Sequence, residues 1–178
     1  MFTIQSVDDI SLLRETATLE CKLASGRDGT GKLPRDFWPT YSSFANTHGG
    51  SVLLGIKETN GNFELVGVTD AAKVRIDLFN DANNRQKVSC NLLSDQNVTE
   101  QVIDGKTIIR VDVPRADRRQ KPVHLTPNPL SGNTYRRLNE GDVSLSDDEV
   151  RRMLSEKIED SRDNRVLGKF TFDDLSLD

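Results

Sequence analysis

The feature that most constrains the fold is an apolar run over residues 51–56 that directly follows two glycines. A nearly continuous apolar stretch of this length is typical of a strand covered on both faces. The segment before the glycines has apolar residues at helical spacing: Phe37, Trp38, Tyr41, Phe44 and Ala45. Gly49 and Gly50 are expected to end this helix, because glycine adopts the left-handed cap conformation at little cost. The pattern predicts a helix that turns sharply into a central, doubly covered strand.

The other elements predicted from the sequence are short. Helices are expected over residues 6–14, after Thr69 or Asp70, and from the capping box that begins at Ser146. Strands are expected at residues 18–23, 63–68, 97–103, 106–113, 122–126 and 134–138. This order predicts an α+β fold, with a mixed, largely antiparallel sheet of about six strands covered by helices. Residues 1–158 are assigned to this domain, and residues 159–178 to a polar linker or the start of a following region.

Composition limits the class of protein. Hydrophobic residues make up 35% of the 178 residues, which suits one core of ordinary size. No apolar run approaches the roughly 18–20 residues that span a membrane, and the first residues do not resemble a signal peptide. We therefore expect a cytoplasmic protein with no membrane partner. Cys21 and Cys90 have no metal-ligand spacing, so we expect buried thiols and no zinc site.

Positive charge is concentrated in one stretch although the net charge is −4. Between Lys106 and Arg137 eight basic residues are opposed only by Asp112 and Asp117. Arginine suits bidentate contact with phosphate, and a tyrosine can stack on an exposed base. The predicted nucleic-acid contacts are Lys22, Lys32, Arg115, Arg118, Arg119, Lys121, Tyr135, Arg136 and Arg137. The alternative is a solvated basic loop beside an acidic helix.

Three blocks of sequence resemble one family. Residues 15–22 have the pattern E-x-x-x-x-E-x-K, residues 44–56 read FANTHGGSVLLGI, and residues 132–142 contain YRRLNEGD, followed by an E-V-x-R-M segment. In this order the blocks resemble the Schlafen-type AlbA-like domain. The resemblance implies a bacterial protein of the kind described as transcriptional regulators or RecG-helicase-related proteins, although no helicase motor is visible. The signature residues Phe44, Ala45, Asn46, Gly49 and Gly50 are interpreted as architectural, with a glycine pair that could also expose backbone N–H groups to a phosphate.

The resemblance also implies an enzymatic alternative. Schlafen relatives with ribonuclease activity use two glutamates five residues apart and a third acid after the apolar strand, which correspond here to Glu15, Glu20 and Glu58. Such carboxylates could hold Mg²⁺ or Mn²⁺ and activate water. The bacterial members usually have an aspartate pair where this chain has Lys57-Glu58, which puts the third ligand in question. The competing interpretation is that Glu20 and Lys22 form an ion pair that orients the strand.

Residues 26–32 fit most of the phosphate-loop pattern G-x-x-x-x-G-K, but Leu33 occupies the place of the Mg²⁺-binding Ser or Thr. A flexible basic loop that touches a phosphate backbone through Lys32 is favoured over nucleotide hydrolysis. The prediction is thus a non-catalytic nucleic-acid-binding domain of a transcriptional regulator, without a cofactor, for which DNA is favoured over RNA. The alternatives are a divalent-metal ribonuclease and a dimerisation or interaction module that forms a homodimer.

Overall fold

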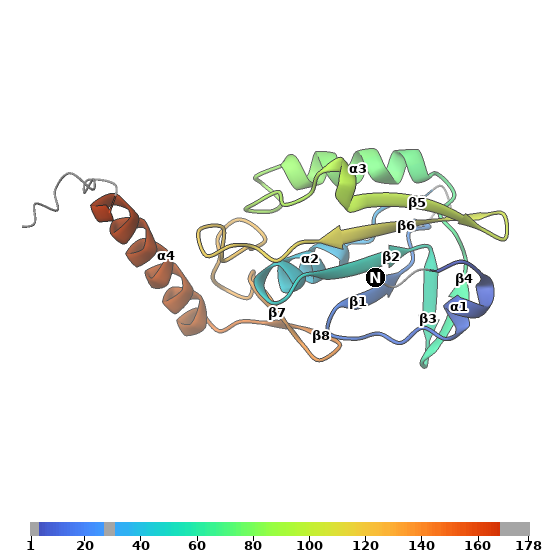
Figure 1. Ribbon diagram of the computed structural model, residues 1–178, viewed down its shortest axis with the longest axis horizontal. Helices are drawn as coiled ribbons and strands as arrows, with labels where there is room; N and C mark the ends of the chain where they lie inside the picture. Colours follow the sequence, from blue (N-terminus) through green and yellow to red (C-terminus); the bar gives the residue numbers. More distant parts are fainter. Residues whose placement is uncertain (1–3, 27–30, 168–178) are drawn as a thin grey trace, which may run out of the picture.

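Runs of strands are separated by single helices in the computed structural model, which describes residues 4–26 and 31–167, with side chains as far as residue 159. The helices are α1 (Val7–Ser11), α2 (Phe37–Asn46), α3 (Ala71–Asn83) and α4 (Asp147–Leu167), with a 3₁₀ turn at Asp95–Asn97. The strands are β1 (Leu19–Lys22), β2 (Gly50–Leu54), β3 (Ile56–Thr59), β4 (Asn62–Leu65), β5 (Val98–Ile103), β6 (Lys106–Val113), β7 (Tyr135–Leu138) and β8 (Gly141–Ser144). This order confirms the α+β class (Figure 1).

The central sheet has the strand order β1-β2-β6-β5. β1 lies parallel to β2, while β2–β6 and β6–β5 are antiparallel, so the sheet is mixed and largely antiparallel, as predicted. The remaining strands form two separate hairpins, β3–β4 and β7–β8. Neither hairpin extends the central sheet.

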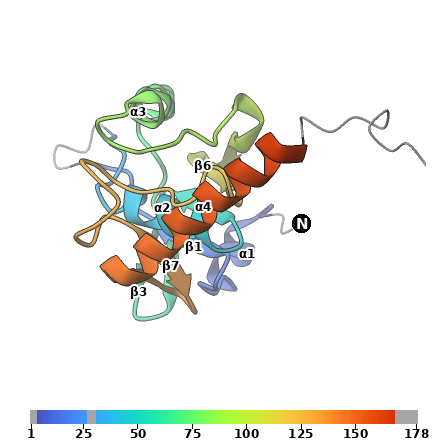
Figure 2. The same cartoon turned by 90° about the vertical axis from the view of Figure 1, so that its left-hand side faces the viewer.

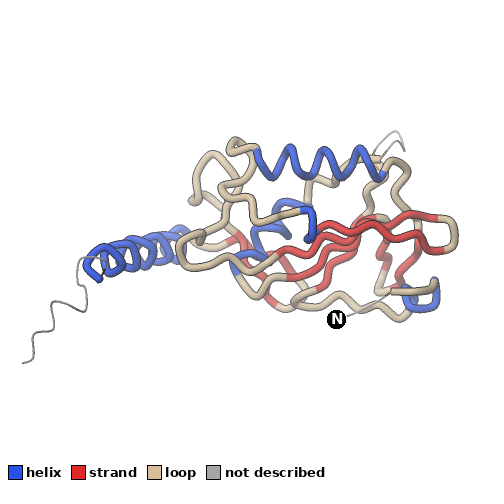
Figure 3. Tube along the Cα trace, turned by 45° about the horizontal axis from the view of Figure 1, so that its top comes forward, coloured by secondary structure: helices blue, strands red, loops and turns tan. Residues whose placement is uncertain are grey.

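Both faces of β2 are covered, as its apolar sequence predicts. Val52 and Leu54 belong to the larger core, which includes residues of α2 and α3. Leu53 faces the other way, into a smaller core with Ile10 of α1 and Ile108 of β6. Because strand side chains alternate, one strand supplies both cores. Figure 3 shows the long helix α3 along one side of the sheet and the short helix α1 at one end of the other.

The apolar run 51–56 is not one strand, which corrects the prediction. Gly55 has φ +100° and turns the chain, so that Ile56 begins β3. The carbonyl of Gly55 accepts from the amides of Val66 and Gly67, at 3.0 and 2.7 Å. A Cβ atom at Gly55 would lie 3.0 Å from the backbone of Gly67. The strand is therefore interrupted where the backbone at Gly55 contacts the backbone at Gly67. A local hydrophobic pattern does not reveal such a contact.

One other expected strand is wrong, and one strand that was not expected is present. Residues 122–126 form only isolated bridges, Leu125 with Val88 and His124 with Thr134. The strand expected at residues 134–138 is present as β7, but it pairs with β8, which was not predicted. Both errors concern short segments, where pairing is decided by distant partners rather than by local propensity.

The helix starts follow the sequence closely. Ser6 and Asp9 form a capping box at α1, and the Asp70 carboxylate accepts from the Lys73 amide at the start of α3. Ser146 and Glu149 form the box expected at α4. α4 continues past residue 159 and projects from the body of the domain (Figures 1 and 2). The segment assigned to a linker is therefore helical through Leu167, and residues 168–178 lie outside the described part.

No helix within residues 4–26 and 31–167 is long and apolar enough to cross a membrane. Cys21 and Cys90 are free thiols, the first buried and the second half-buried. Burial, together with the charges of the nearby carboxylates of Glu15 and Glu20, raises the pKa of the Cys21 thiol to about 12. Such a thiol is unreactive at neutral pH.

The glycine pair after α2 is fixed by close contacts as well as by backbone angles. Gly49 has φ +76°, and its amide donates to the Phe44 carbonyl at 2.8 Å. A Cβ atom at Gly49 would lie 2.8 Å from the carbonyl oxygen of Val113, and one at Gly50 would lie 2.7 Å from the Phe44 ring. The pair thus allows α2 to end against β6.

This packing predicts an unequal cost for two glycine substitutions. Gly61 has nearly the same backbone angle (φ +77°), but nothing lies within 4 Å of a Cβ atom built there. Gly61→Ala should lower the free energy of unfolding by about 1–2 kcal/mol, the cost of the left-handed conformation. Gly49→Ala should cost about 1–3 kcal/mol more, because of the clash with β6. Urea denaturation measures both, and equal losses would contradict the role given to the contact with Val113.

Candidate functional site

Arg137 is the centre of a buried ionic cluster. Its side chain is only 1% exposed, although it lies on the short hairpin β7–β8. Nη2 lies 2.7 Å from Oε2 of Glu20, and Nη1 lies 2.9 Å from Oδ1 of Asp142. Nη2 also donates to the carbonyl of Thr16 at 3.0 Å, and the guanidinium stacks over the Phe44 ring at 5.0 Å. The cluster thus links the hairpin β7–β8 to β1 through Glu20 and to α2 through Phe44.

Lys22 extends the same cluster. Its Nζ lies 3.0 Å from Oε1 of Glu20 and 2.9 Å from Oδ2 of Asp36, and its side chain is 7% exposed. Burial alone would lower the pKa of this ammonium, but the hydrogen bond and charge of Asp36 and the charge of Glu20 outweigh it, so the pKa is raised. Both oxygens of Glu20 are therefore engaged by cations. The interpretation of Glu20 and Lys22 as an ion pair describes this geometry.

Lys22 and Arg137 are thus placed in the interior, and neither can reach a nucleic acid on the surface. Burial of the two cations is tolerated because each has carboxylate partners that offset the cost of removing its charge from water. Asp36 and Asp142 were not singled out in the sequence, where nothing marks a distant acid as the partner of a given base.

The three glutamates of the ribonuclease alternative do not form a ligand set. Oε1 of Glu15 accepts from the amide of Cys21 at 3.1 Å, and Glu58 accepts from the amide of Gly61. Glu15 and Glu58 line a pocket of about 510 Å³ together with Arg14 and Glu140, while Glu20 is held by its two cations. In the described ranges, no three Asp, Glu, His or Cys side chains are grouped closely enough to hold a metal ion. The residues present do not fit the metal that the resemblance implies.

Glu15 is nevertheless electrostatically unusual. Burial raises the pKa of its carboxyl, the Cys21 amide opposes this by donating a hydrogen bond, and the charges of Glu20 and Glu58 raise it further. A carboxyl whose pKa is raised in the folded state makes folding less favourable at a pH where it is ionised. Burial of the Glu15 carboxylate therefore lowers the free energy of unfolding at neutral pH.

The signature residues form the junction between α2 and the second half of the chain. The side-chain amide of Asn46 donates to the carbonyls of Val123 and Tyr135, at 2.8 and 2.9 Å, and its Oδ1 accepts from the Val123 amide at 2.9 Å. The carbonyl of Ala45 accepts from the Ala116 amide at 2.9 Å. These contacts agree with the architectural interpretation of the signature.

The same junction positions the basic loop, defined here as residues 114–121. Lys121 is half-buried and donates from Nζ to the carbonyl of Asn46 at 2.9 Å. Burial lowers the pKa of Lys121, and the charge of Arg115 lowers it further. Oδ1 of Asp117 accepts from the amides of Arg119 and Gln120, at 2.8 and 2.9 Å, and forms a tight turn. Arg115, Arg118 and Arg119 are exposed on this anchored loop.

The other predicted contacts are dispersed. Arg136 points outward from β7 and pairs with Glu149 at 3.0 Å. Tyr135 lies on the inward side of β7, with Arg137, and is half-buried. Lys32 is exposed but follows Gly31, which packs against Asp70. Asp70 in turn lies near the start of β6, because the amide of the nearby Val68 donates to the Thr107 carbonyl. Lys32 is therefore near the start of β6, whereas the basic loop follows the other end of this strand.

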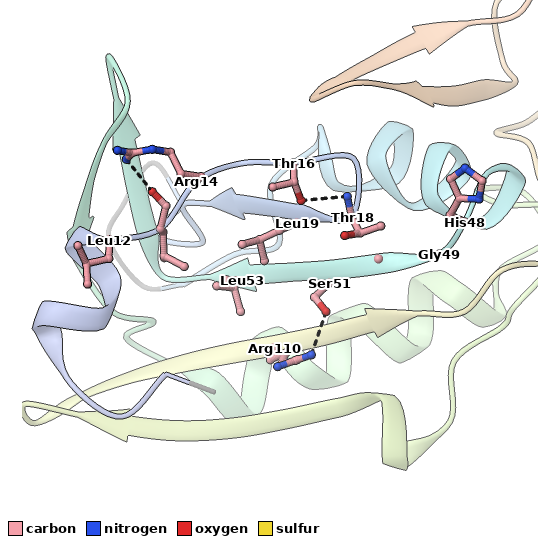
Figure 4. Close-up of a pocket in the computed structure, with 12 residues that line it drawn as sticks. Leu12, Arg14, Thr16, Thr18, Leu19, His48, Gly49, Ser51, Leu53 and Arg110 are labelled. Atoms are coloured by element: carbon pink, nitrogen blue, oxygen red, sulfur yellow. Dashed lines mark hydrogen bonds between the residues drawn. The ribbon is translucent and has the colours of Figure 1, made fainter. Parts of the chain in front are cut away.

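A groove that the sequence did not indicate lies beside the basic loop. It consists of a pocket of about 590 Å³ and an adjoining one of about 330 Å³, both lined by His48, Gly49, Gly50 and Ser51. Arg115 lines the smaller pocket, and Arg14 lines the far end of the larger one. Arg110 of β6 also lines the larger pocket, and its Nη2 donates to Oγ of Ser51 at 3.1 Å (Figure 4). Nε of Arg110 donates to Oδ1 of Asp112 at 2.8 Å. The hydrophobic pattern of the sequence did not reveal this groove, because its lining residues come from four separate segments.

Comparisons with known proteins give a family match in sequence and a similar domain of known structure. The sequence profile of the family described as Schlafen, AlbA_2 matches residues 15–146. The chain is also similar to the N-terminal domain of a protein from Nitrosomonas europaea described as related to the ATP-dependent DNA helicase RecG, solved by solution NMR. The identity is 28%, the TM-score is 0.56, and the match covers 76% of this chain and 90% of the other.

A crystal structure of the DIP2311 protein from Corynebacterium diphtheriae matches at 18% identity with a TM-score of 0.48. That match covers 72% of this chain and 22% of the other chain. The search of curated proteins gives no match.

The buried cluster predicts different costs for two neighbouring arginines. Arg137→Met should lower the free energy of unfolding by about 3–5 kcal/mol, because it leaves Asp142 buried without its cation and Glu20 with Lys22 as its one remaining cation. Arg136→Met removes only an exposed pair and should cost less than about 1 kcal/mol. The combined change Glu20→Gln with Arg137→Met should cost less than the two single changes added together, since the two groups interact. Additive losses in urea denaturation would show that the pair is not coupled.

The raised pKa of Glu15 predicts a pH-dependent stabilisation by Glu15→Gln. The neutral amide avoids the cost of a buried charge, and its oxygen can still accept from the Cys21 amide. The variant should unfold at higher urea concentration than the wild type at pH 7.5. The difference should disappear as the pH falls through the folded-state and then the unfolded-state pKa of Glu15, because the wild-type carboxyl is then protonated. The exposed Glu64→Gln is the control, and a difference that grows at acid pH would refute the explanation.

Proposed function

The chain belongs to the Schlafen AlbA_2 family, and from this premise we propose that it is the nucleic-acid-binding domain of a transcriptional regulator. The contact surface is the basic loop with the adjoining groove. One observation carries the proposal: Arg115, Arg118 and Arg119 are exposed together on a loop that is anchored to the end of α2. A local concentration of arginine on an otherwise acidic chain is the electrostatic footprint of a phosphate-binding surface.

The anchoring supports binding to phosphates. Two bonds hold the loop, from Ala116 to Ala45 and from Lys121 to Asn46, so its backbone is ordered before any ligand arrives. Preorganisation lowers the entropy lost on binding. Contacts of this kind bind the phosphate backbone and carry little sequence information. We favour DNA over RNA because the similar domain of known structure is part of a protein described as related to a DNA helicase.

A non-catalytic role is favoured over the ribonuclease alternative on geometric grounds. A metal-dependent nuclease needs carboxylate oxygens that are free to bind the ion. Here Lys22 and Arg137 hold the two oxygens of Glu20. The dimerisation module stays the alternative that the mass measurement below tests.

The test is a triple substitution in the basic loop. Changing Arg115, Arg118 and Arg119 together to Gln should weaken binding of a fluorescent 30-mer by on the order of 10- to 100-fold at low salt. The slope of log affinity against log salt should become shallower by about one per lost phosphate contact. Fluorescence anisotropy at several salt concentrations measures both quantities. The matched control removes the same charge near the opposite end of β6, by changing Arg35, Lys57 and Lys73 to Gln.

An equal loss in the control would mean that only net charge matters, and the loop would then have no special role. The same samples with Mn²⁺ report on catalysis. Metal-dependent shortening of an RNA 30-mer that Glu20→Gln abolishes would replace the proposal with the nuclease. Absence of binding together with a doubled mass in light scattering would favour the dimerisation module.

A further inference from the structure

We propose that the larger pocket of the groove receives an unpaired nucleotide, so that the domain binds single strands or strand ends in preference to a continuous duplex. This inference rests on the proposed function and adds to it the form of nucleic acid that is bound. The pocket adjoins the basic loop through the smaller pocket, and the two share the segment from His48 to Ser51. A strand that contacts the loop at Arg115 can therefore continue into the pocket.

Size favours a nucleotide over a duplex. The pocket holds about 590 Å³, within the range of roughly 300–1,000 Å³ typical of sites for small ligands. A double helix cannot enter a cavity of this size, whereas one splayed base with its sugar can. Proteins that bind single-stranded nucleic acid take up unstacked bases in this manner.

The position of the pocket on the sheet explains why it is open. Its floor is the face of β2 and β6 that carries Leu53 and Arg110, opposite the face covered by α2 and α3. Towards the start of β6 this second face is covered by α1 and the hairpin β3–β4. Beside Ser51 and Arg110 the covering stops, and the pocket begins there (Figure 4).

The chemistry of the lining suits a base and its phosphate. Leu12, Leu19 and Leu53 provide apolar contact for a base. Ser51 and Arg110 provide hydrogen-bonding groups on the floor, and Oδ1 of Asp112 accepts from Arg110. Charge along the groove comes from three arginines and one aspartate: Arg14, Arg110, Arg115 and Asp112. Arg14 and Arg115, one in each pocket, are side chains suited to contact the phosphates of a bound strand.

The glycine pair contributes to the groove as well as to packing. Gly49 and Gly50 line both pockets. A Cβ atom at Gly49 would meet β6, and one at Gly50 would meet the Phe44 ring, so packing excludes larger residues at both positions.

Filling the pocket with a bulky side chain tests the proposal. Thr18 is exposed and lines the pocket, and it joins the sheet through its backbone carbonyl, which accepts from the Ser51 amide at 2.8 Å. Thr18→Trp should block the pocket without changing charge or fold. Leu12→Trp blocks it from another wall, since Leu12 is 76% exposed. The control is Ala17→Trp, at an exposed position that is not part of the pocket lining.

The probes are a single-stranded DNA 12-mer, the same sequence as a blunt duplex, and the duplex with a five-nucleotide 3′ overhang. We expect the wild-type chain to bind the single strand and the overhang at least about 10-fold more tightly than the blunt duplex. Each pocket-filling variant should reduce this preference at least about 5-fold and leave binding to the blunt duplex unchanged. Circular dichroism and thermal unfolding establish that each variant is folded.

Failure of this inference is distinguishable from failure of the proposed function. If the wild type binds all three probes equally, or if both pocket-filling variants behave like Ala17→Trp, the pocket takes no nucleotide and the basic loop alone explains binding. If the wild type binds none of the probes, both proposals are overturned.

Discussion

The buried pairing of Arg137 with Glu20 is the interaction on which the arrangement of the domain depends. It joins the hairpin β7–β8 to β1, and the stacking over Phe44 adds α2 to the same cluster. A buried charge is tolerated only where its partners are fixed, so the pairing specifies where the hairpin must lie. With Lys22 on the other oxygen, it leaves both oxygens of Glu20 engaged by cations. One interaction thus fixes the hairpin and is the reason that we propose a non-catalytic surface.

The junction after α2 has a comparable influence on the surface. Asn46 links the end of the helix to Val123 and Tyr135, and Gly49 brings β2 against the end of β6. Because the basic loop leaves β6 at this point, the same contacts that close the core also hold the exposed arginines. Architectural and functional interpretations of a signature are therefore compatible. Phe44, Ala45 and Asn46 bind no ligand in our proposal but position the residues that do, whereas Gly49 and Gly50 also line the groove.

Some parts of this structure were accessible from sequence because they depend on near neighbours. The helix over Phe37–Asn46, the two strands that flank Asp104-Gly105 and the starts of three other helices were predicted from residue spacing and capping chemistry. Others were not accessible. The break at Gly55 results from its contact with Gly67, and the pairing of β7 with β8 depends on how the hairpin packs. Among the candidate contacts, the exposed loop was indicated by its charge, whereas burial of Lys22 depends on Asp36.

By itself, then, the sequence determined the α+β class, the helix with its glycine junction, and the presence of a basic segment in an acidic chain. These properties follow from local periodicity and composition, which act over a few residues. Only the tertiary structure decided which charges are available at the surface. Arg137 and Glu20 are 117 residues apart in the chain, and Thr40 and Asp142 are 102 apart. The groove likewise exists only where separate segments meet, because its lining is a product of packing rather than of any one stretch of sequence.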